Sequence, residues 1–252
     1  MSVTYDDIVS AQQEQGDVIR KTSLTFSDTF TQLTGSTVYL KNEFEQKTGS
    51  FKLRGAYYKI KTLSEEERKN GVVAASAGNH AQGVAYASAL EKINCTIVMP
   101  KNASPAKVAA TRGYGATVVL EGKNYDESWI KAQEIAKTTG ATIIHAFDDS
   151  QIIAAQGVIG LEIIEQLPDV DEIYVPIGGG GLAAGILVAI KDKNPNVKVI
   201  GVESKSFPAM KKSLDSGKVE TIEGGFTVAD GISVRTPGEQ TFEIIKDKID
   251  EI

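Results

Sequence analysis

Lys52 has the residue type and the position of a nucleophilic amine. It stands in the segment 48–56, which reads TGSFKLRGA, two residues after Ser50, a side chain able to cap a helix. A lysine in the first turn of a helix meets the positive end of the helix dipole, and this lowers the pKa of its amine. A neutral amine can form a Schiff base with a carbonyl compound. Most lysines of the chain must be solvated surface residues, and this segment alone does not exclude that for Lys52.

A second polar loop, residues 76–83 (SAGNHAQG), follows an apolar run and opens a helix pattern of small residues. Backbone N–H groups exposed at such a helix start suit a carboxylate. The same residues are equally typical of a tight strand-to-helix turn with Asn79 in the left-handed region. His80 is a candidate acid or base, although a capping or packed histidine is the more common case.

Four successive glycines, residues 178–181, separate a strand pattern from a helix pattern. Their uncovered amides and the helix dipole together make a cradle for a phosphate group. A merely flexible loop explains them poorly, because ordering four glycines costs entropy. Gly179, Gly181 and Ala184 also fit the dinucleotide pattern G-x-G-x-x-A, with Glu203 placed to bind a ribose. A nicotinamide site therefore stays open, whereas a P-loop is excluded because no lysine follows the glycines.

The elements that must position these loops alternate between strand and helix. Strands are predicted at residues 72–75, 95–99, 116–120, 141–145, 172–177 and 197–202. Helices are predicted at residues 81–90, 125–139, 151–166, 182–193 and 207–214, and another from residue 105 to near Gly113 or Gly115. The strands are apolar on both faces, as buried parallel strands are. The sequence thus predicts an α/β fold of two lobes, each a parallel sheet between helices, with a ligand cleft at the carboxyl ends of the strands.

The composition fits an ordinary folded protein of 252 residues, with 41% hydrophobic and 24% charged residues. Its net charge of −6 argues against a nucleic-acid binder and against adhesion to anionic membranes. One cysteine and two histidines exclude an intramolecular disulfide and a Cys- or His-rich metal site. The first residues do not look like a signal peptide and no apolar stretch could span a bilayer, so a cytoplasmic protein is expected.

In this order, the loops resemble those of the pyridoxal-phosphate enzymes of the tryptophan-synthase-β type, and most of all those of the threonine dehydratases (threonine ammonia-lyases). The resemblance runs along nearly the whole chain. Its motifs are residues 41–43, 46–56, 76–83, 156–157, 178–181, 201–203 and 229–231. Each motif is moderately specific, and their combination in this order is highly specific.

The resemblance implies a role for each loop. Lys52 would bind pyridoxal 5′-phosphate through a Schiff base, with Phe51 beside it, and Asn79 would hydrogen-bond the phenolic oxygen of the cofactor ring. The residues implied for the substrate carboxylate are Ser76, Ala77, Gly78, Asn79 and His80. The residues implied for the cofactor phosphate are Gly178, Gly179, Gly180, Gly181 and Leu182. No metal site is expected, since residues 204–210 offer no acid to join Glu203.

The implied activity is the conversion of L-threonine, and of L-serine as well, to 2-oxobutanoate or pyruvate and ammonia. Ala77 stands where serine racemases carry a serine that acts on the second face of the substrate, which favours elimination over racemisation. A serine racemase-like enzyme, a nicotinamide-dependent oxidoreductase and a non-catalytic binding module stay as alternatives. The resemblance also implies a homo-oligomer, a dimer or tetramer. It does not separate a role in isoleucine biosynthesis from one in threonine catabolism.

The resemblance further divides the chain into two domains. Residues 1–53 and 147–252 would form a large cofactor-binding domain, and residues 54–146 a small α/β domain. Relatives continue beyond the position of Ile252, so we expect the C-terminal part of the large domain to be missing. Residues 241–252 look like an uncapped helix. On this basis we expect the chain alone to bind the cofactor weakly and to turn over threonine poorly.

Overall fold

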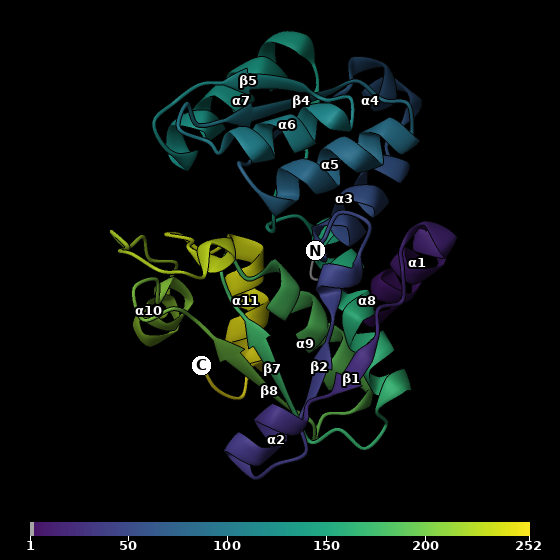
Figure 1. The fold of residues 1–252 in the computed structure, drawn as a ribbon, viewed down its shortest axis with the longest axis vertical. Coiled ribbons are helices and arrows are strands. Elements are labelled where there is room, and N and C mark those ends of the chain that lie inside the picture. The colour runs from purple at the N-terminus through teal and green to yellow at the C-terminus, as the bar shows by residue number, and fades with distance from the viewer. Residues whose placement is uncertain (1–2) are drawn as a thin grey trace.

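The computed structural model describes residues 3–252, which form an upper and a lower lobe in the view of Figure 1. The helices are α1 Tyr5–Gln15, α2 Asp28–Thr34, α3 Lys52–Lys61, α4 Glu65–Asn70, α5 Asn79–Leu90, α6 Pro105–Gly113, α7 Tyr125–Thr139, α8 Ser150–Gln166, α9 Gly181–Lys193, α10 Ala209–Ser216 and α11 Glu239–Lys248. The strands are β1 Leu24–Phe26, β2 Tyr39–Lys41, β3 Val72–Ala75, β4 Cys95–Met99, β5 Thr117–Leu120, β6 Thr142–Ile143, β7 Glu172–Pro176 and β8 Lys198–Val202. Short 3-10 turns lie at Gly16–Val18, Glu43–Glu45 and Asp230–Ile232.

The upper lobe is a parallel sheet with helices on both faces. Its strands run in the order β5-β4-β3-β6. Because side chains alternate along a strand, Val72 and Ala74 join the core beneath α3 and α5, whereas Val73 and Ala75 pack toward α7. The apolar runs of β3 and β4 are buried on both faces, as the sequence predicts.

The lower lobe packs α1, α8, α9 and α11 against the parallel pair β7–β8. Helices α8 and α9 come very close, because Gly157 and Gly185 meet at their crossing. A Cβ atom at Gly185 would lie 2.6 Å from the amide nitrogen of Gly157 and would overlap the carbonyl oxygen of Ile153. The two glycines therefore allow a backbone-to-backbone contact that no larger residue permits.

The burial expected on both faces does not hold for β7. Ile173 and Val175 are buried, but Tyr174 between them is 63% exposed, and β8 alternates in the same way. The reason is that α8 and α9 cover one face of this sheet, and no helix of residues 3–252 packs extensively on the other.

Most predicted elements are confirmed to within one or two residues, and β4 and α7 have the bounds predicted for them. Two further expectations are wrong. Residues 241–252 are not one uncapped helix, because α11 ends at Lys248 and Glu251 then pairs with Ile200 beside β8. Ser50 does not cap α3, since that helix begins after Phe51 and the Ser50 hydroxyl is buried without a hydrogen-bond partner in the described chain. No helix within residues 3–252 has the length and apolar character needed to cross a membrane.

Candidate active site

Lys52 is the first residue of α3, and its amine is buried. Its Nζ donates a hydrogen bond to the carbonyl oxygen of Ala146 at 2.7 Å and lies 5.3 Å from the centre of the Phe51 ring. No carboxylate of residues 3–252 forms an ion pair with this amine. Burial lowers the pKa of Lys52 to about 8. The pKa shift expected from the sequence is therefore present, but burial is its cause rather than the helix dipole.

The first turn of α3 is held between two other helices. On one side Gly83 of α5 faces the backbone of Lys52, where an added Cβ would lie 3.2 Å from the Lys52 carbonyl. On the other side Gly55 faces Gln156 of α8, whose amide nitrogen would lie 2.6 Å from such an atom. This close packing on both sides fixes the backbone of the first turn of α3 between α5 and α8.

The loop between β3 and α5 presents free backbone amides. The Ser76 amide continues the sheet by donating to Val98, and the Ser76 hydroxyl accepts from the amide of Gly78. The amides of Ala77 and of residues 79–81 find no acceptor within the described residues. Ala77 and Gly78 are half-buried and the Asn79 side chain is exposed. The loop therefore offers hydrogen-bond donors to an anion without carrying a positive side chain.

His80 in this loop is buried, and its ring is hydrogen-bonded. Its Nε2 lies 2.9 Å from the carbonyl oxygen of Ile144, so this nitrogen carries the proton and donates it. Burial, and next the charge of Lys52, lower the pKa of His80 to about 3. The imidazole is thus neutral and its ring donor is used, so the hydrogen-bond donor that His80 offers to a ligand is its backbone N–H.

The four glycines form the turn between β7 and α9, as predicted. Gly180 has a φ of +99°, in the left-handed region that favours glycine. The amides of residues 178–183 have no acceptor in the described part of the chain. The carbonyl of Gly179 accepts from the Thr241 hydroxyl at 2.6 Å and from the Gly238 amide at 3.2 Å, which ties the turn to the start of α11. Free amides in a fixed turn at a helix N-terminus are an anion site.

The segment 144–149 brings the three loops together, and sequence analysis missed its part in the site. The Ile144 carbonyl contacts His80, the Ala146 carbonyl contacts Lys52, and the ring of Phe147 packs against Gly179 so closely that a Cβ there would overlap it. Two of these contacts use backbone atoms, which residue types do not reveal. The only signal in the sequence was the position of this segment, which includes the carboxyl end of the predicted strand 141–145.

His145 shapes this segment. Its Nδ1 accepts from the amides of Phe147 at 3.2 Å and Asp148 at 2.8 Å, so the ring is neutral and closes a tight turn. Burial lowers the pKa of His145 below its usual value, which favours the same neutral state. Asp148 then accepts from the amides at the start of α11, while Asp149 caps α8.

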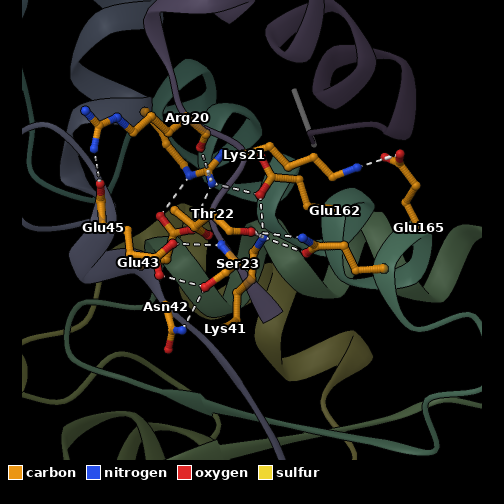
Figure 2. Close-up of polar contacts among 12 residues, drawn as sticks. Arg20, Lys21, Thr22, Ser23, Lys41, Asn42, Glu43, Glu45, Glu162 and Glu165 are labelled. Atoms are coloured by element: carbon orange, nitrogen blue, oxygen red, sulfur yellow. Dashed lines mark hydrogen bonds and ion pairs between the residues drawn. The ribbon is translucent and has the colours of Figure 1, made fainter. Parts of the chain in front are cut away.

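A buried network of ion pairs joins α3 to neighbouring elements. Arg54, two residues after Lys52, is fully buried and pairs with Glu43 at 2.8 Å and Glu162 at 2.7 Å. Lys41 shares Glu162 at 2.6 Å, and burial lowers the pKa of this lysine. Figure 2 shows how Glu43, Glu162 and Lys41 converge between β2 and α8. Two cations and two anions balance here, and this fixes α3 relative to α8 and β2.

Glu203 does not point to a ribose site. Both of its carboxylate oxygens accept from backbone amides at the start of α10, those of Met210 at 2.8 Å and Lys211 at 2.9 Å. Its acceptors thus serve as a helix cap, and burial raises its pKa. Glu203 is therefore not free to bind the ribose of a nicotinamide cofactor, and the nicotinamide alternative loses its support.

Each of the three loops fits a different chemical group of a ligand. The glycine turn fits a phosphate, the loop 76–81 fits a carboxylate, and the Lys52 amine, which has only a carbonyl beside it, fits an aldehyde. A phosphorylated aldehyde together with an amino acid has this set of groups.

The family model described as pyridoxal-phosphate dependent enzyme matches residues 16–252. An L-threonine ammonia-lyase of Thermotoga maritima is 53% identical over 250 residues, which are 99% of this chain and 62% of that protein. The catabolic L-threonine dehydratase TdcB of Escherichia coli is 47% identical over 252 residues, which are 100% of this chain and 77% of that protein. The chain therefore spans somewhat less than two thirds of the first relative and about three quarters of the second.

Two solved structures agree closely with the fold. The structure of maize serine racemase has a TM-score of 0.96 at 33% identity and is covered to 76%, with all of this chain matched. The processed form of threonine deaminase isoform 2 from Solanum lycopersicum has a TM-score of 0.94 at 38% identity and is covered to 72%, again with all of this chain matched.

Proposed function

The chain belongs to the family of pyridoxal-phosphate-dependent enzymes, and from this premise we propose that it is an L-threonine ammonia-lyase. It converts L-threonine, and L-serine as a second substrate, to the 2-oxo acid and ammonia. The relatives named as threonine dehydratases or ammonia-lyases support the substrate. The observation that carries the proposal is the buried Lys52 amine, whose pKa of about 8 suits a group that must lose and regain a proton near neutral pH.

The site residues fit pyridoxal 5′-phosphate. We assign its carbonyl to Lys52, its phosphate to the amides of the glycine turn with Leu182, and its ring to the space beside Phe51 and Asn79. The support is the set of unpaired donors in these loops and the absence of a counter-ion for Lys52 within residues 3–252. When bound, this cofactor withdraws electrons from the substrate and so stabilises negative charge at its Cα.

The protein's own groups would orient the substrate and move one proton. The amides of the loop 76–81 bind the substrate carboxylate and hold the amino acid in one orientation. The Lys52 amine, neutral in part at pH 7–8, takes the proton from Cα, and the Ala146 carbonyl accepts a hydrogen bond from the resulting ammonium. The neutral carbonyl stabilises the ammonium less than a carboxylate would, so Lys52 can release the proton again.

Ala77 supports elimination rather than racemisation. Racemisation needs a second acid or base on the opposite face of the Cα carbon, and alanine provides none. His80, the titratable residue of this loop, uses its ring donor on the Ile144 carbonyl. A serine racemase-like activity therefore has less support than the lyase, even though the fold is shared.

The test is formation of 2-oxo acid from L-threonine and from L-serine, with pyridoxal 5′-phosphate added. Lys52→Ala should abolish turnover and the visible absorbance of bound cofactor while the far-UV circular dichroism stays unchanged. Lys47→Ala, which removes an exposed lysine of the same segment, is the matched control and should keep both. Turnover by Lys52→Ala at the wild-type rate would refute the assignment.

We further propose the domain division given by the resemblance, with residues 1–53 and 147–252 as the large domain and residues 54–146 as the small one. Its support is the separation of the apolar cores. One core draws on α1, α8, α9 and α11, and the other lies mainly between Leu53 and Ile152. We also propose that the chain acts as a homo-oligomer in the cytoplasm, in amino-acid metabolism. Its single cysteine, buried and unpaired, is compatible with a reducing compartment.

A further inference from the structure

Thr241, the third residue of α11, is a buried polar side chain that the proposed mechanism does not use. It is fully buried, and its hydroxyl donates to the carbonyl of Gly179 at 2.6 Å, with the carbonyl of Gly238 at 3.1 Å. A hydroxyl has one proton, so the shorter contact, with the glycine turn, is the stronger one. Helix α11 packs against α9 and α10 (Figure 1). The glycine turn is therefore held by a side chain from a separate element.

The peptide between Gly179 and Gly180 carries this contact to the opposite side of the turn. In a trans peptide, the carbonyl oxygen and the N–H of the next residue point in opposite directions. Because Thr241 holds the Gly179 carbonyl toward α11, the N–H of Gly180 points away from α11. This N–H is among the amides of residues 178–183 that have no acceptor in the described part of the chain. It is thus free to bind an oxygen of a phosphate.

This peptide needs an external contact to keep its orientation, because it has glycine on both sides. Glycine adopts positive and negative φ about equally well, so neither flanking residue resists a rotation of the peptide. Gly180 itself has a φ of +99°. A rotated peptide would turn the Gly179 carbonyl oxygen toward the bound phosphate, where two negative groups would repel each other. A fixed hydrogen bond to this carbonyl prevents that rotation.

Thr241 also lies directly against the turn. A Cβ atom at Gly180 would be 2.7 Å from the Thr241 hydroxyl oxygen and 2.8 Å from the Thr241 Cβ. The glycine at this position is therefore required by the close approach of α11 as well as by its φ. The side chain that orients the peptide and the peptide itself are packed without a gap.

Asp148 fixes the position of Thr241 from the other side. Its carboxylate accepts hydrogen bonds from the amides of the first three residues of α11, at 2.9 to 3.3 Å. A carboxylate in this position also interacts favourably with the helix dipole. Asp148 belongs to the segment whose Ala146 carbonyl contacts Lys52. The start of α11 is thus bonded both to the glycine turn and to the segment beside the amine.

We propose that Thr241 is a positioning residue for the cofactor phosphate, because its hydroxyl keeps the N–H of Gly180 turned toward that group. The proposal rests on the assignment of the phosphate to the glycine turn and names the residue that orients the turn. Thr241 acts through the Gly179 carbonyl, since it lies on the α11 side of the peptide. Its loss should weaken binding of the phosphate and leave the reaction of Lys52 with the cofactor carbonyl unchanged.

The experiment is a spectroscopic titration of the chain with pyridoxal 5′-phosphate and, separately, with pyridoxal, which lacks the phosphate. Thr241→Val removes the hydroxyl and keeps the volume of the side chain. Thr241→Ala removes it without placing a methyl group against the Gly179 carbonyl. Both should raise the dissociation constant of pyridoxal 5′-phosphate about tenfold and that of pyridoxal less than about twofold, as expected for one lost charge-assisted hydrogen bond. Thr241→Ser keeps the hydroxyl and should restore wild-type binding.

Thr111→Val is the matched control. Thr111 is also fully buried in a helix, and its hydroxyl donates to the backbone carbonyl of Lys107 at 2.9 Å, but its helix α6 lies in the upper lobe. This variant should leave both dissociation constants unchanged. A general loosening of the fold would weaken both ligands alike, whereas the proposed role of Thr241 weakens only the phosphorylated one. Far-UV circular dichroism checks that every variant is folded.

Inorganic phosphate gives a second readout that needs no cofactor. A ligand that binds only the folded chain raises the midpoint of thermal unfolding. Phosphate should therefore raise this midpoint in the wild type, in Thr111→Val and in Thr241→Ser. The rise should be smaller in Thr241→Val and Thr241→Ala, because their glycine turn no longer keeps its donor in place.

Two titration results would overturn the inference. Equal weakening of both ligands in Thr241→Val and Thr241→Ala would show that Thr241 only supports the fold. Unchanged binding of both ligands would show that the peptide keeps its orientation without the hydroxyl. A wild-type chain that binds neither ligand would instead remove the proposed function. The phosphate measurement then decides alone, and an equal midpoint rise in all variants, or none in the wild type, would overturn the inference too.

Discussion

At the scale of single residues, the environment of Lys52 is defined by what faces its amine. A buried lysine usually has a carboxylate beside it, which keeps it charged, but here the partner is the carbonyl of Ala146. The amine is therefore held in a state that loses its proton readily. Electrostatics around this one group set the pH range in which the site can work.

The lowered pKa predicts how the stability of the cofactor-free chain depends on pH. The pKa is about 8 in the folded chain and 10.5 when the lysine is solvated, so between these values the unfolded chain binds more protons. Stability should then rise with pH from 8 to 10.5. In Lys52→Met this rise should be smaller, by up to about 3 kcal/mol, at 1.36 kcal/mol per pKa unit. Urea unfolding of both proteins at several pH values measures it, and parallel curves would contradict it.

His145 should be replaceable by asparagine but not by glutamine. Asparagine carries its oxygen near the position of Nδ1 and can accept from Phe147 and Asp148, whereas the glutamine amide lies farther out. His145→Gln should lose about 1–2 kcal/mol of unfolding free energy, the contribution of two hydrogen bonds. It should also weaken cofactor binding, because Ala146 and Phe147 lose their positions. His145→Asn should lose less than half of that stability. Urea unfolding and a cofactor titration test this, and equal losses in both variants would contradict it.

At the scale of elements, the crossing of α8 and α9 depends on two glycines. Gly185→Ala places a methyl group against the backbone of Ile153 and Gly157, so we expect a loss of about 1–3 kcal/mol from overpacking. Gly113→Ala at the end of α6 is the control, because an added Cβ there meets no atom within 4 Å. It should be neutral or stabilising, since alanine has the higher helix propensity. Thermal unfolding of the two variants measures the difference, and a stable Gly185→Ala protein would show that the helices can separate without cost.

Elements with a clear apolar pattern were predictable from the sequence. The strands β3 and β4 are short apolar runs bounded by turn residues, and α7 has a helical period that stops at Gly140. The segment 24–41 was not predicted, because its apolar residues follow no regular period and none of its elements has a buried face that would impose one. The exposed face of β7 was missed for a related reason, since an apolar strand says nothing about whether a helix covers it.

The loops of the site could be predicted from their residue types. The way in which the loops contact one another could not. Two of the loops could be identified because small, glycine-rich polar segments lie between a strand pattern and a helix pattern, and the third because a lysine is unusual in the first turn of a helix. The contacts that join them are made by the carbonyls of Ile144 and Ala146 and by the ring of Phe147. Such contacts depend on tertiary structure alone. The roles assigned to the individual site residues stay predictions.

At the scale of the whole molecule, the network around Arg54 joins distant parts of the chain. Arg54→Met leaves Glu43 without its partner and Glu162 with Lys41 only, so we expect a loss of at least about 3 kcal/mol. Arg68→Met removes a partly exposed pair with Glu91 and should cost at most about 1 kcal/mol. Urea unfolding compares the two, and similar small losses would show that the buried network is dispensable.

The order in which the two lobes can fold during synthesis follows from the packing of α1 against α8 and α9. Helix α1 belongs to the lower lobe, yet its partners α8 and α9 are made only after the whole upper lobe has been translated. The upper lobe of a nascent chain can therefore fold first. Until α8 and α9 have been synthesised, Ile8 and Ala11 of α1 stay exposed. Closing a loop of this length is slow, and chaperones that recognise apolar helices have a long interval in which to bind. We expect the first helix to be the last part of the new protein to become resistant to protease.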